Sequence, residues 1–243
     1  MKTYTKAIAA LVLMCLFTAC SVTYQYYQIS QTTPVDKSII KNDNDDSGYY
    51  YQDPFCRITY NFWSEKGNAG FTVTNLTNQV LYIVKDKCFF IKNGVSYDYY
   101  HGEEWSSPAI AGQPVKNTKE SNLIGIPPRT SRTISEYPIY TYIYVDCDLD
   151  RKPMLNRPVT MSFTRANSPV EFGNFITYKL GEQGAERSVT HMFYTSRVTN
   201  YRKDDIVYTE KKEYCPNVSD LKMYQDSILR FAPTTGYYIK YVK

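Results

Sequence analysis

Residues that usually carry out catalysis are scarce in this chain of 243 residues. It has only two histidines, His101 and His191, and neither has a partner at the spacing of a metal site. The sequence also lacks a Gly-x-Ser-x-Gly nucleophile motif, a glycine-rich phosphate loop and a Cys-x-x-Cys pair. We therefore expect a protein that is not an enzyme, with no cofactor and no metal site.

A run of basic residues is also missing. The 28 Lys and Arg alternate along the chain with 24 Asp and Glu, and the formal net charge is only +4. Binding to nucleic acid requires a clustered basic surface, so we expect no nucleic-acid partner. The 43% of hydrophobic residues and the low count of 11 Gly are typical of a folded chain and exclude a disordered one.

The apolar run at the start of the chain falls short of the roughly 20 residues that span a bilayer. Residues 7–17 are apolar, Lys2 and Lys6 precede them, and the small residues Thr18 and Ala19 follow. A short apolar run between basic residues and small residues is typical of a secretory signal. The chain is therefore predicted to be exported.

Cys20 comes directly after the small residues, so Leu-Phe-Thr-Ala-Cys at 16–20 resembles a bacterial lipobox. The resemblance implies that residues 1–19 are a lipoprotein signal peptide and that Cys20 carries acyl chains after cleavage. Several acyl chains hold a protein stably in a membrane. Ser21 follows the cysteine, and by the sorting rule of enteric lipoproteins it favours the outer membrane, on either its periplasmic or its cell-surface side.

Residues 20–51 are interpreted as a lipidated tether, because they include a polar stretch rich in Asp and Asn with no apolar period. A calcium loop is the alternative, since Asp43, Asp45 and Ser47 match the first half of an EF-hand loop. The twelfth position of that loop falls on Pro54, where a bidentate Glu is needed. The tether is the favoured interpretation.

After the tether, segments with apolar residues at every second position predict strand after strand. Ile58, Tyr60 and Phe62 share one face of the first of them. Asn93 and Gly94 separate two more strands and suit a type I′ hairpin turn, because both positions need a positive φ. Further strands are predicted at residues 70–74, 80–84, 122–126, 130–135, 139–145, 159–164, 172–180, 189–198, 206–210 and 237–242.

These strands predict a mainly β fold. We expect an immunoglobulin-like β-sandwich at residues 52–145, followed by a second β-rich unit at residues 146–243 with one short helix. A turn-rich segment at 146–158 marks the boundary between them. The helix is expected at 219–229, with Ser219 as its N-cap.

Four cysteines remain once the signal is removed and Cys20 is acylated: Cys56, Cys88, Cys147 and Cys215. An even count in an exported protein permits two disulfides, with three pairings. Burial as free thiols is the alternative, because Cys packs like a small apolar residue. The sequence leaves both open.

Two acidic clusters are further candidates for chemistry. Glu103 or Glu104 beside Trp105 would suit a glycan hydrolase, with the Trp stacking on a sugar. A solvated acidic loop is the favoured interpretation, since adjacent residues rarely face one pocket. The three Asp residues within 146–150 alternate and would suit calcium, but Asp is also common in turns, and we favour a turn.

The tripeptide Asp226-Ser227-Ile228 resembles the short O-glycosylation acceptor that one group of Gram-negative gut anaerobes uses on exported proteins, which makes Ser227 a candidate glycosylation residue. Several longer stretches resemble a family of uncharacterised outer-membrane lipoproteins from the same anaerobes. These stretches are residues 24–28, 58–64, 67–71, 89–94 and 146–149. The resemblance implies an envelope lipoprotein, and no activity or site residues come with it.

Together these features favour a lipid-anchored, non-enzymatic binding or structural module of the cell envelope. Its expected partners are the membrane, through the acyl chains on Cys20, and an envelope protein or a glycan. An adhesin or pilus-type subunit, in which edge strands of neighbouring copies pair, is one alternative. A glycan hydrolase using Glu103 or Glu104 is the other.

Overall fold

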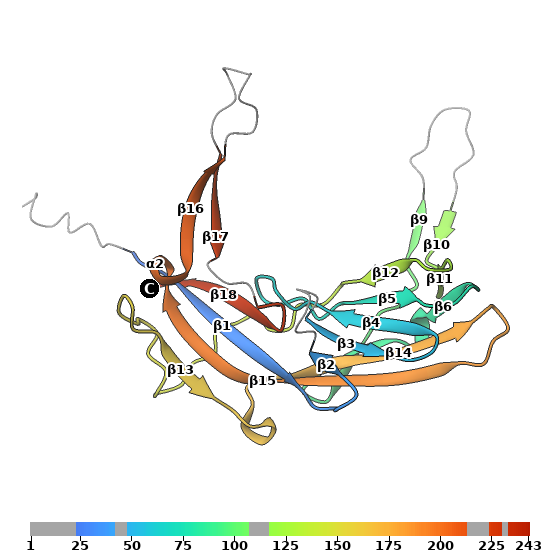
Figure 1. Ribbon diagram of the computed structural model, residues 1–243, viewed down its shortest axis with the longest axis horizontal. Helices are drawn as coiled ribbons and strands as arrows, with labels where there is room; N and C mark the ends of the chain where they lie inside the picture. The colour runs from blue at the N-terminus through green and yellow to red at the C-terminus, as the bar shows by residue number, and fades with distance from the viewer. Residues whose placement is uncertain (1–22, 42–47, 107–116, 213–223, 230–232) are drawn as a thin grey trace, which may run out of the picture.

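Two antiparallel sheets make up most of the computed structural model (Figure 1). It describes residues 23–41, 48–106, 117–212, 224–229 and 233–243. The larger sheet has nine strands: β1 (Gln25–Pro34), β6 (Leu81–Val84), β7 (Phe89–Lys92), β8 (Val95–Asp98), β11 (Leu123–Ile126), β13 (Val159–Ser162), β14 (Glu171–Leu180), β15 (Arg187–Arg202) and β18 (Gly236–Val242). The smaller sheet has five: β2 (Ile40–Lys41), β3 (Tyr49–Gln52), β4 (Cys56–Tyr60), β5 (Phe71–Asn75) and β12 (Ser131–Ile134).

Two separate hairpins project from the same side of the molecule (Figure 1). They are formed by β9 (Glu104–Ser106) with β10 (Asn117–Lys119), and by β16 (Val207–Lys212) with β17 (Tyr224–Leu229). The described helices are short: η1 (Lys85–Lys87), η2 (Arg165–Asn167) and α2 (Lys203–Ile206). The prediction of a mainly β chain is therefore confirmed.

The main core lies between the two sheets and is largely aromatic. Phe62 lies with its ring centroid 4.9 Å from that of Phe193 and 5.1 Å from that of Phe172, both edge to face. Tyr60 meets Phe193 at 5.1 Å. Edge-to-face pairs stabilise a core beyond the area they bury, and this explains part of the high tyrosine and phenylalanine content.

The hairpin predicted at Asn93 and Gly94 is confirmed. Strand β7 pairs with β8 so that Lys92 lies opposite Val95. The φ angles are 47° at Asn93 and 80° at Gly94, as a type I′ turn requires.

The predicted boundary at residue 146 does not divide the chain into two sheets. Strand β14, from the second half, pairs with β6 through Tyr178–Leu180 and with β7 through Phe172–Phe175. The segment 52–145 therefore does not form a sandwich by itself, since its strands β6, β7, β8 and β11 belong to the sheet that β14 and β15 complete. Alternation along one strand reveals which face is buried, but not which strand lies beside it.

The predicted tether at 20–51 is wrong for most of its described length. Strand β1 lies between β15 and β18 in the larger sheet, and Tyr26 to Ser30 are all buried. The strand was hidden because its buried residues include Gln28, Ser30 and Thr32. These polar side chains are accommodated through hydrogen bonds, such as that from Gln28 Nε2 to Asn200 Oδ1 at 2.9 Å.

Two further elements differ from prediction. Residues 224–229, predicted as the end of a helix, form β17, which pairs with β16 in continuous register; residues 219–223 lie outside the described part of the chain. Residues 139–145 alternate like a strand but run as an irregular segment. There the backbone N–H groups of Ile139 and Tyr140 bond to Gly67 O and Lys66 O, and no strand ladder continues beyond them.

Candidate functional site

The sequence-predicted site residues are not brought together. Cys20 and Cys215 lie outside the described residues, as do Asp43, Asp45 and Ser47 of the calcium alternative. Ser227 is on β17, opposite Thr209 of β16. Glu103 and Glu104 are both exposed at the start of the β9–β10 hairpin, and the Glu103 carbonyl accepts a hydrogen bond from the Glu120 N–H at 2.8 Å.

The three described cysteines carry free thiols. Cys56 and Cys88 are fully buried, and burial raises the pKa of both thiols, that of Cys88 to about 11. Cys88 Sγ donates to Val84 O at 3.2 Å and accepts from the Thr177 N–H at 3.3 Å. Cys147 is exposed and lies in the cleft described next.

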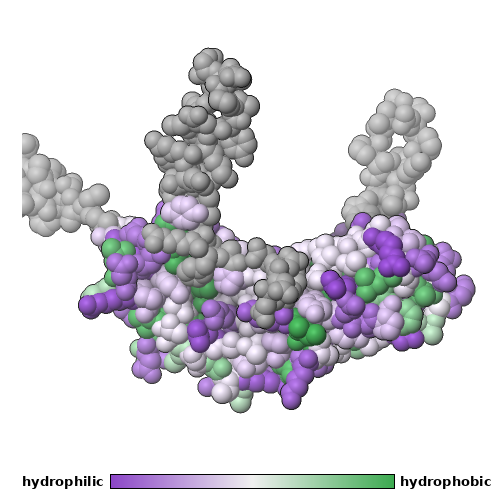
Figure 2. All heavy atoms as spheres, viewed as in Figure 1, coloured by the Kyte–Doolittle hydropathy of each residue, from purple (hydrophilic) through white to green (hydrophobic). Residues whose placement is uncertain are grey.

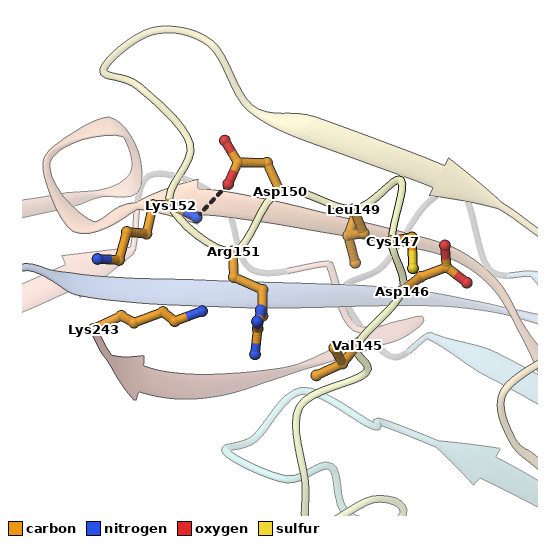
Figure 3. Close-up of a pocket in the computed structure, with 8 residues that line it drawn as sticks. All are labelled: Val145, Asp146, Cys147, Leu149, Asp150, Arg151, Lys152 and Lys243. Carbon is orange, nitrogen blue, oxygen red and sulfur yellow. Dashed lines mark hydrogen bonds between the residues drawn. The ribbon is translucent and has the colours of Figure 1, made fainter.

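A cleft of about 540 Å³ opens beside the start of β1 (Figure 3). Its walls come from two places that are far apart in the sequence, the loop at 145–152 and Lys243 at the end of β18. We call this the basic cleft, because Arg151, Lys152 and Lys243 line it.

Buried polar groups of the sheet hold the loop in place. Gln28 Nε2 donates to Tyr144 O at 2.9 Å, and Gln28 Oε1 accepts from the Tyr144 N–H at 2.6 Å. Asn200 Nδ2 donates to Asp150 O at 2.8 Å, and Leu149 is buried against the sheet. Because Gln28 and Asn200 are themselves bonded and fully buried, the cleft wall rests on a rigid network.

The carboxylates of the cleft are engaged within its own turns. Asp146 Oδ1 accepts from the Asp148 N–H at 3.0 Å, and Asp146 Oδ2 accepts from the Tyr144 hydroxyl at 3.2 Å. Asp150 Oδ1 accepts from the Lys152 N–H at 2.8 Å. The carboxylates of Asp146 and Asp150 thus stabilise turns, as favoured from the sequence. The described residues contain no cluster of three or more potential metal-ligating side chains.

The cations of the cleft have no acidic partner. None of Arg151, Lys152 and Lys243 forms an ion pair within the described residues. In Figure 3 the side chains of Arg151 and Lys243 lie next to each other. Desolvation and the positive charges of Arg151 and Lys152 lower the pKa of Lys243. The three cations outnumber the two carboxylates, Asp146 and Asp150, that also line the cleft, and an excess of positive charge attracts anions.

Sequence reasoning missed this cleft. The pair Arg151-Lys152 directly follows the acidic turn and was a local signal, but Lys243 is 91 residues beyond Lys152 in the sequence. Only the pairing of β1 with β18 brings it there.

A second charged cluster lies at the base of the β9–β10 hairpin. Lys85 Nζ is 2.5 Å from Glu120 Oε1 and 2.9 Å from Glu136 Oε1, and His101 Nε2 is 3.1 Å from Glu136 Oε2. Glu120 Oε2 also accepts from the N–H groups of His101 and Gly102 at 2.9 and 2.8 Å. The Lys85 hydrogen bond is the largest cause that lowers the pKa of Glu120 to about 2. These contacts join residues on both sides of the hairpin base, so this cluster fastens the hairpin.

His191 is the one histidine in the core. Its Nδ1 is hydrogen-bonded to the Tyr60 hydroxyl at 2.6 Å, and its ring lies 4.7 Å from the Tyr51 ring. Its Nε2 is buried without a partner among the described residues. Desolvation lowers its pKa to about 4. A buried, neutral imidazole that is hydrogen-bonded to Tyr60 and packed against Tyr51 is typical of a core packing residue.

No family model matches the chain, and comparison with curated proteins and with solved structures gives no match. Within the described residues, no helix has both the length and the apolar character needed to cross a bilayer. Hydrophobic residues on the face in Figure 2 lie scattered among hydrophilic ones and do not form one continuous patch.

Proposed function

We propose that the chain is a lipid-anchored protein of the cell envelope, attached to the outer membrane through Cys20, and that it is a non-enzymatic binding module. The lipobox-like residues 16–20 support the anchor, and the sequence resemblance to envelope lipoproteins supports the location. The site it would use is the basic cleft, which accepts a negatively charged group.

The observation that carries this proposal is that the basic side chains of the cleft form no ion pair within the described residues. Most exposed charges of a soluble domain are interspersed with opposite ones, yet here Arg151, Lys152 and Lys243 share one cleft while the neighbouring carboxylates of Asp146 and Asp150 bond to backbone N–H and hydroxyl groups. The three cations carry one charge more than the two carboxylates of the cleft, and like charges held close together repel one another. A bound anion would offset this excess of positive charge.

Membrane fractionation tests the anchor. The full-length Cys20→Ala variant, expressed in a Gram-negative host, should lose its acyl chains and the detergent dependence of its extraction. Cys147→Ala is the matched control, since it removes an exposed thiol outside the lipobox-like sequence. A Cys20→Ala protein that enters the detergent phase as fully as the wild type would contradict the anchor.

One observation favours the adhesin or pilus-type alternative. Among the described strands, β8 pairs only with β7, and its Val95 and Tyr97 are 54% and 43% exposed. An open edge with apolar side chains can pair with a strand of another copy. Such a subunit would form ladders on a native gel, and Tyr97→Lys should abolish them. A monomeric wild-type protein at high concentration would contradict this alternative.

A further inference from the structure

The basic cleft lies where the chain leaves the predicted anchor. The N–H of Lys243 donates to Tyr24 O at 3.3 Å, and Gln25 pairs with Val242. Tyr24 is only four residues after Cys20. Because an extended chain spans at most about 3.6 Å per residue, Cys20 lies within about 14 Å of Tyr24. The acylated cysteine therefore cannot be far from the cleft.

From this juxtaposition we propose that the basic cleft binds the anionic headgroups of the membrane that holds the acyl chains. The inference rests on the proposed anchor at Cys20 and names the ligand of the cleft. The folded part then sits against the bilayer at this end, and the anchor together with the cleft fixes its orientation.

The charge and the length of the connection both favour a lipid surface over a soluble anion. Because Cys20 lies within at most about 14 Å of Tyr24, the cleft end can approach the surface to within one Debye length, about 8 Å at physiological salt, where its cations feel the surface potential of anionic lipid. A connection of four residues does not let the folded part move far from the surface, whereas the predicted tether of 20–51 would have done so. Headgroup phosphates are thus the anions present at the highest local concentration.

The opposite end of the molecule should stay away from the membrane. Strand β15 extends from the cleft end to the β14–β15 turn at the far end (Figure 1). Its 16 residues span roughly 50 Å when extended. Gln183 is exposed in that turn, and a probe there reports on a position that cannot touch headgroups in this orientation.

The test uses the full lipidated protein with Cys215→Ser, reconstituted in vesicles. A fluorescent label is attached to Cys147, which is the exposed cysteine among the described residues and lines the cleft. Nitroxide on the lipid headgroup quenches a label that touches the surface. Vesicles of phosphatidylethanolamine with phosphatidylglycerol are compared with vesicles in which phosphatidylcholine replaces the anionic lipid.

We expect stronger quenching at Cys147 in the anionic vesicles, and little at Gln183→Cys in a Cys147→Ser background. A triple variant should remove the dependence on anionic lipid; it combines Arg151→Gln, Lys152→Gln and Lys243→Gln. Each basic residue near an anionic surface changes the equilibrium constant for membrane contact by about fivefold. Salt at about 0.5 M, where the Debye length is near 4 Å, should do the same.

The outcomes separate this inference from the proposed anchor. Mass spectrometry of the same sample shows whether Cys20 is acylated. Acylated protein whose Cys147 quenching is equal in both vesicles, or unchanged in the triple variant, keeps the anchor and overturns the headgroup site. Acylated protein whose quenching is abolished by millimolar inorganic phosphate in both vesicle types indicates a soluble anion and also overturns it. Unmodified Cys20 overturns both claims.

Discussion

At the scale of single residues, burial decides which thiols react. Cys56 and Cys88 are fully buried with raised pKa values, whereas Cys147 is exposed. Because the thiolate is the reactive form, we predict that iodoacetamide modifies Cys147 in the native protein and reaches Cys56 and Cys88 only after unfolding. Peptide mass spectrometry of native and denatured samples measures this. Equal modification of Cys56 and Cys147 under native conditions would show that the core is open.

His191 should make stability depend on pH. Its pKa falls from 6.5 to about 4 on folding, so below pH 6.5 the unfolded chain binds a proton that the folded protein does not. The contribution of His191 to stability is constant above pH 6.5 and declines as the pH drops towards 4, by up to about 3 kcal/mol. Urea unfolding across this range should show the decline in wild type and lose that part of it in His191→Gln. His101→Gln, at an exposed position, is the control, and an unchanged pH profile in His191→Gln would refute the assignment.

At the scale of elements, Glu120 fastens the β9–β10 hairpin to the sheet. Its carboxylate bonds to Lys85 and to the N–H groups of His101 and Gly102. Its pKa is lowered, so this contribution is present above about pH 4.5 and is lost as the pH falls towards 2. We predict that Glu120→Gln accelerates amide exchange at residues 101–102 several-fold at neutral pH, since local opening follows the loss of such contacts.

The Glu103→Gln variant provides the matched control for that measurement, because Glu103 is exposed and its backbone carbonyl, not its side chain, bonds to Glu120. It should leave the exchange at residues 101–102 unchanged. Equal exchange rates in Glu120→Gln and wild type would mean that the strand pairing alone holds the hairpin.

The strands themselves show what local patterning predicts well. Segments that alternate and bury one face, such as β4 with Ile58 and Tyr60, were predicted within a few residues, as was the Asn93-Gly94 turn. Strand β1 was missed because Gln28 is a buried polar residue whose partners come from distant parts of the chain. Strand β17 was mistaken for a helix because it has only six residues. A segment this short, with its apolar residues at the two ends, fits both the 3.6-residue period of a helix and the two-residue period of a strand.

At the scale of the whole molecule, the larger sheet combines strands from both halves of the sequence. The pairing of β14 with β6 and β7 and the insertion of β1 between β15 and β18 join both halves of the described chain in one sheet. We predict one cooperative transition, with fluorescence and far-ultraviolet circular dichroism coinciding. Two separated transitions would restore the two-domain interpretation.

The aromatic core that the two sheets share gives a second test of cooperative unfolding. Phe193→Ala should cost about 3–5 kcal/mol and shift both probes together, because Phe193 packs against residues of both sheets. Tyr142→Ala, at a side chain that is 76% exposed, should change the free energy of unfolding by less than about 0.5 kcal/mol.

The candidate site was harder to predict than the strands, because it depends on how distant strands pair. The acidic turn at 146–150 was visible in the sequence, and its role in turns follows from ordinary Asp chemistry. The cleft was not visible, because the β1–β18 pairing places Lys243 beside Arg151. Long-range pairing of this kind has no signature in the local pattern of a single sequence.

Mass spectrometry of the N-terminal peptide, from protein extracted out of the membrane of a Gram-negative host, is the sharpest test of the lipid anchor. We predict that the mature chain begins at Cys20, that this residue carries the mass of its acyl chains, and that Ser21 follows it unmodified. A mature chain that begins elsewhere, or a Cys20 without added acyl mass, would contradict the lipid anchor and the membrane-facing cleft that depends on it.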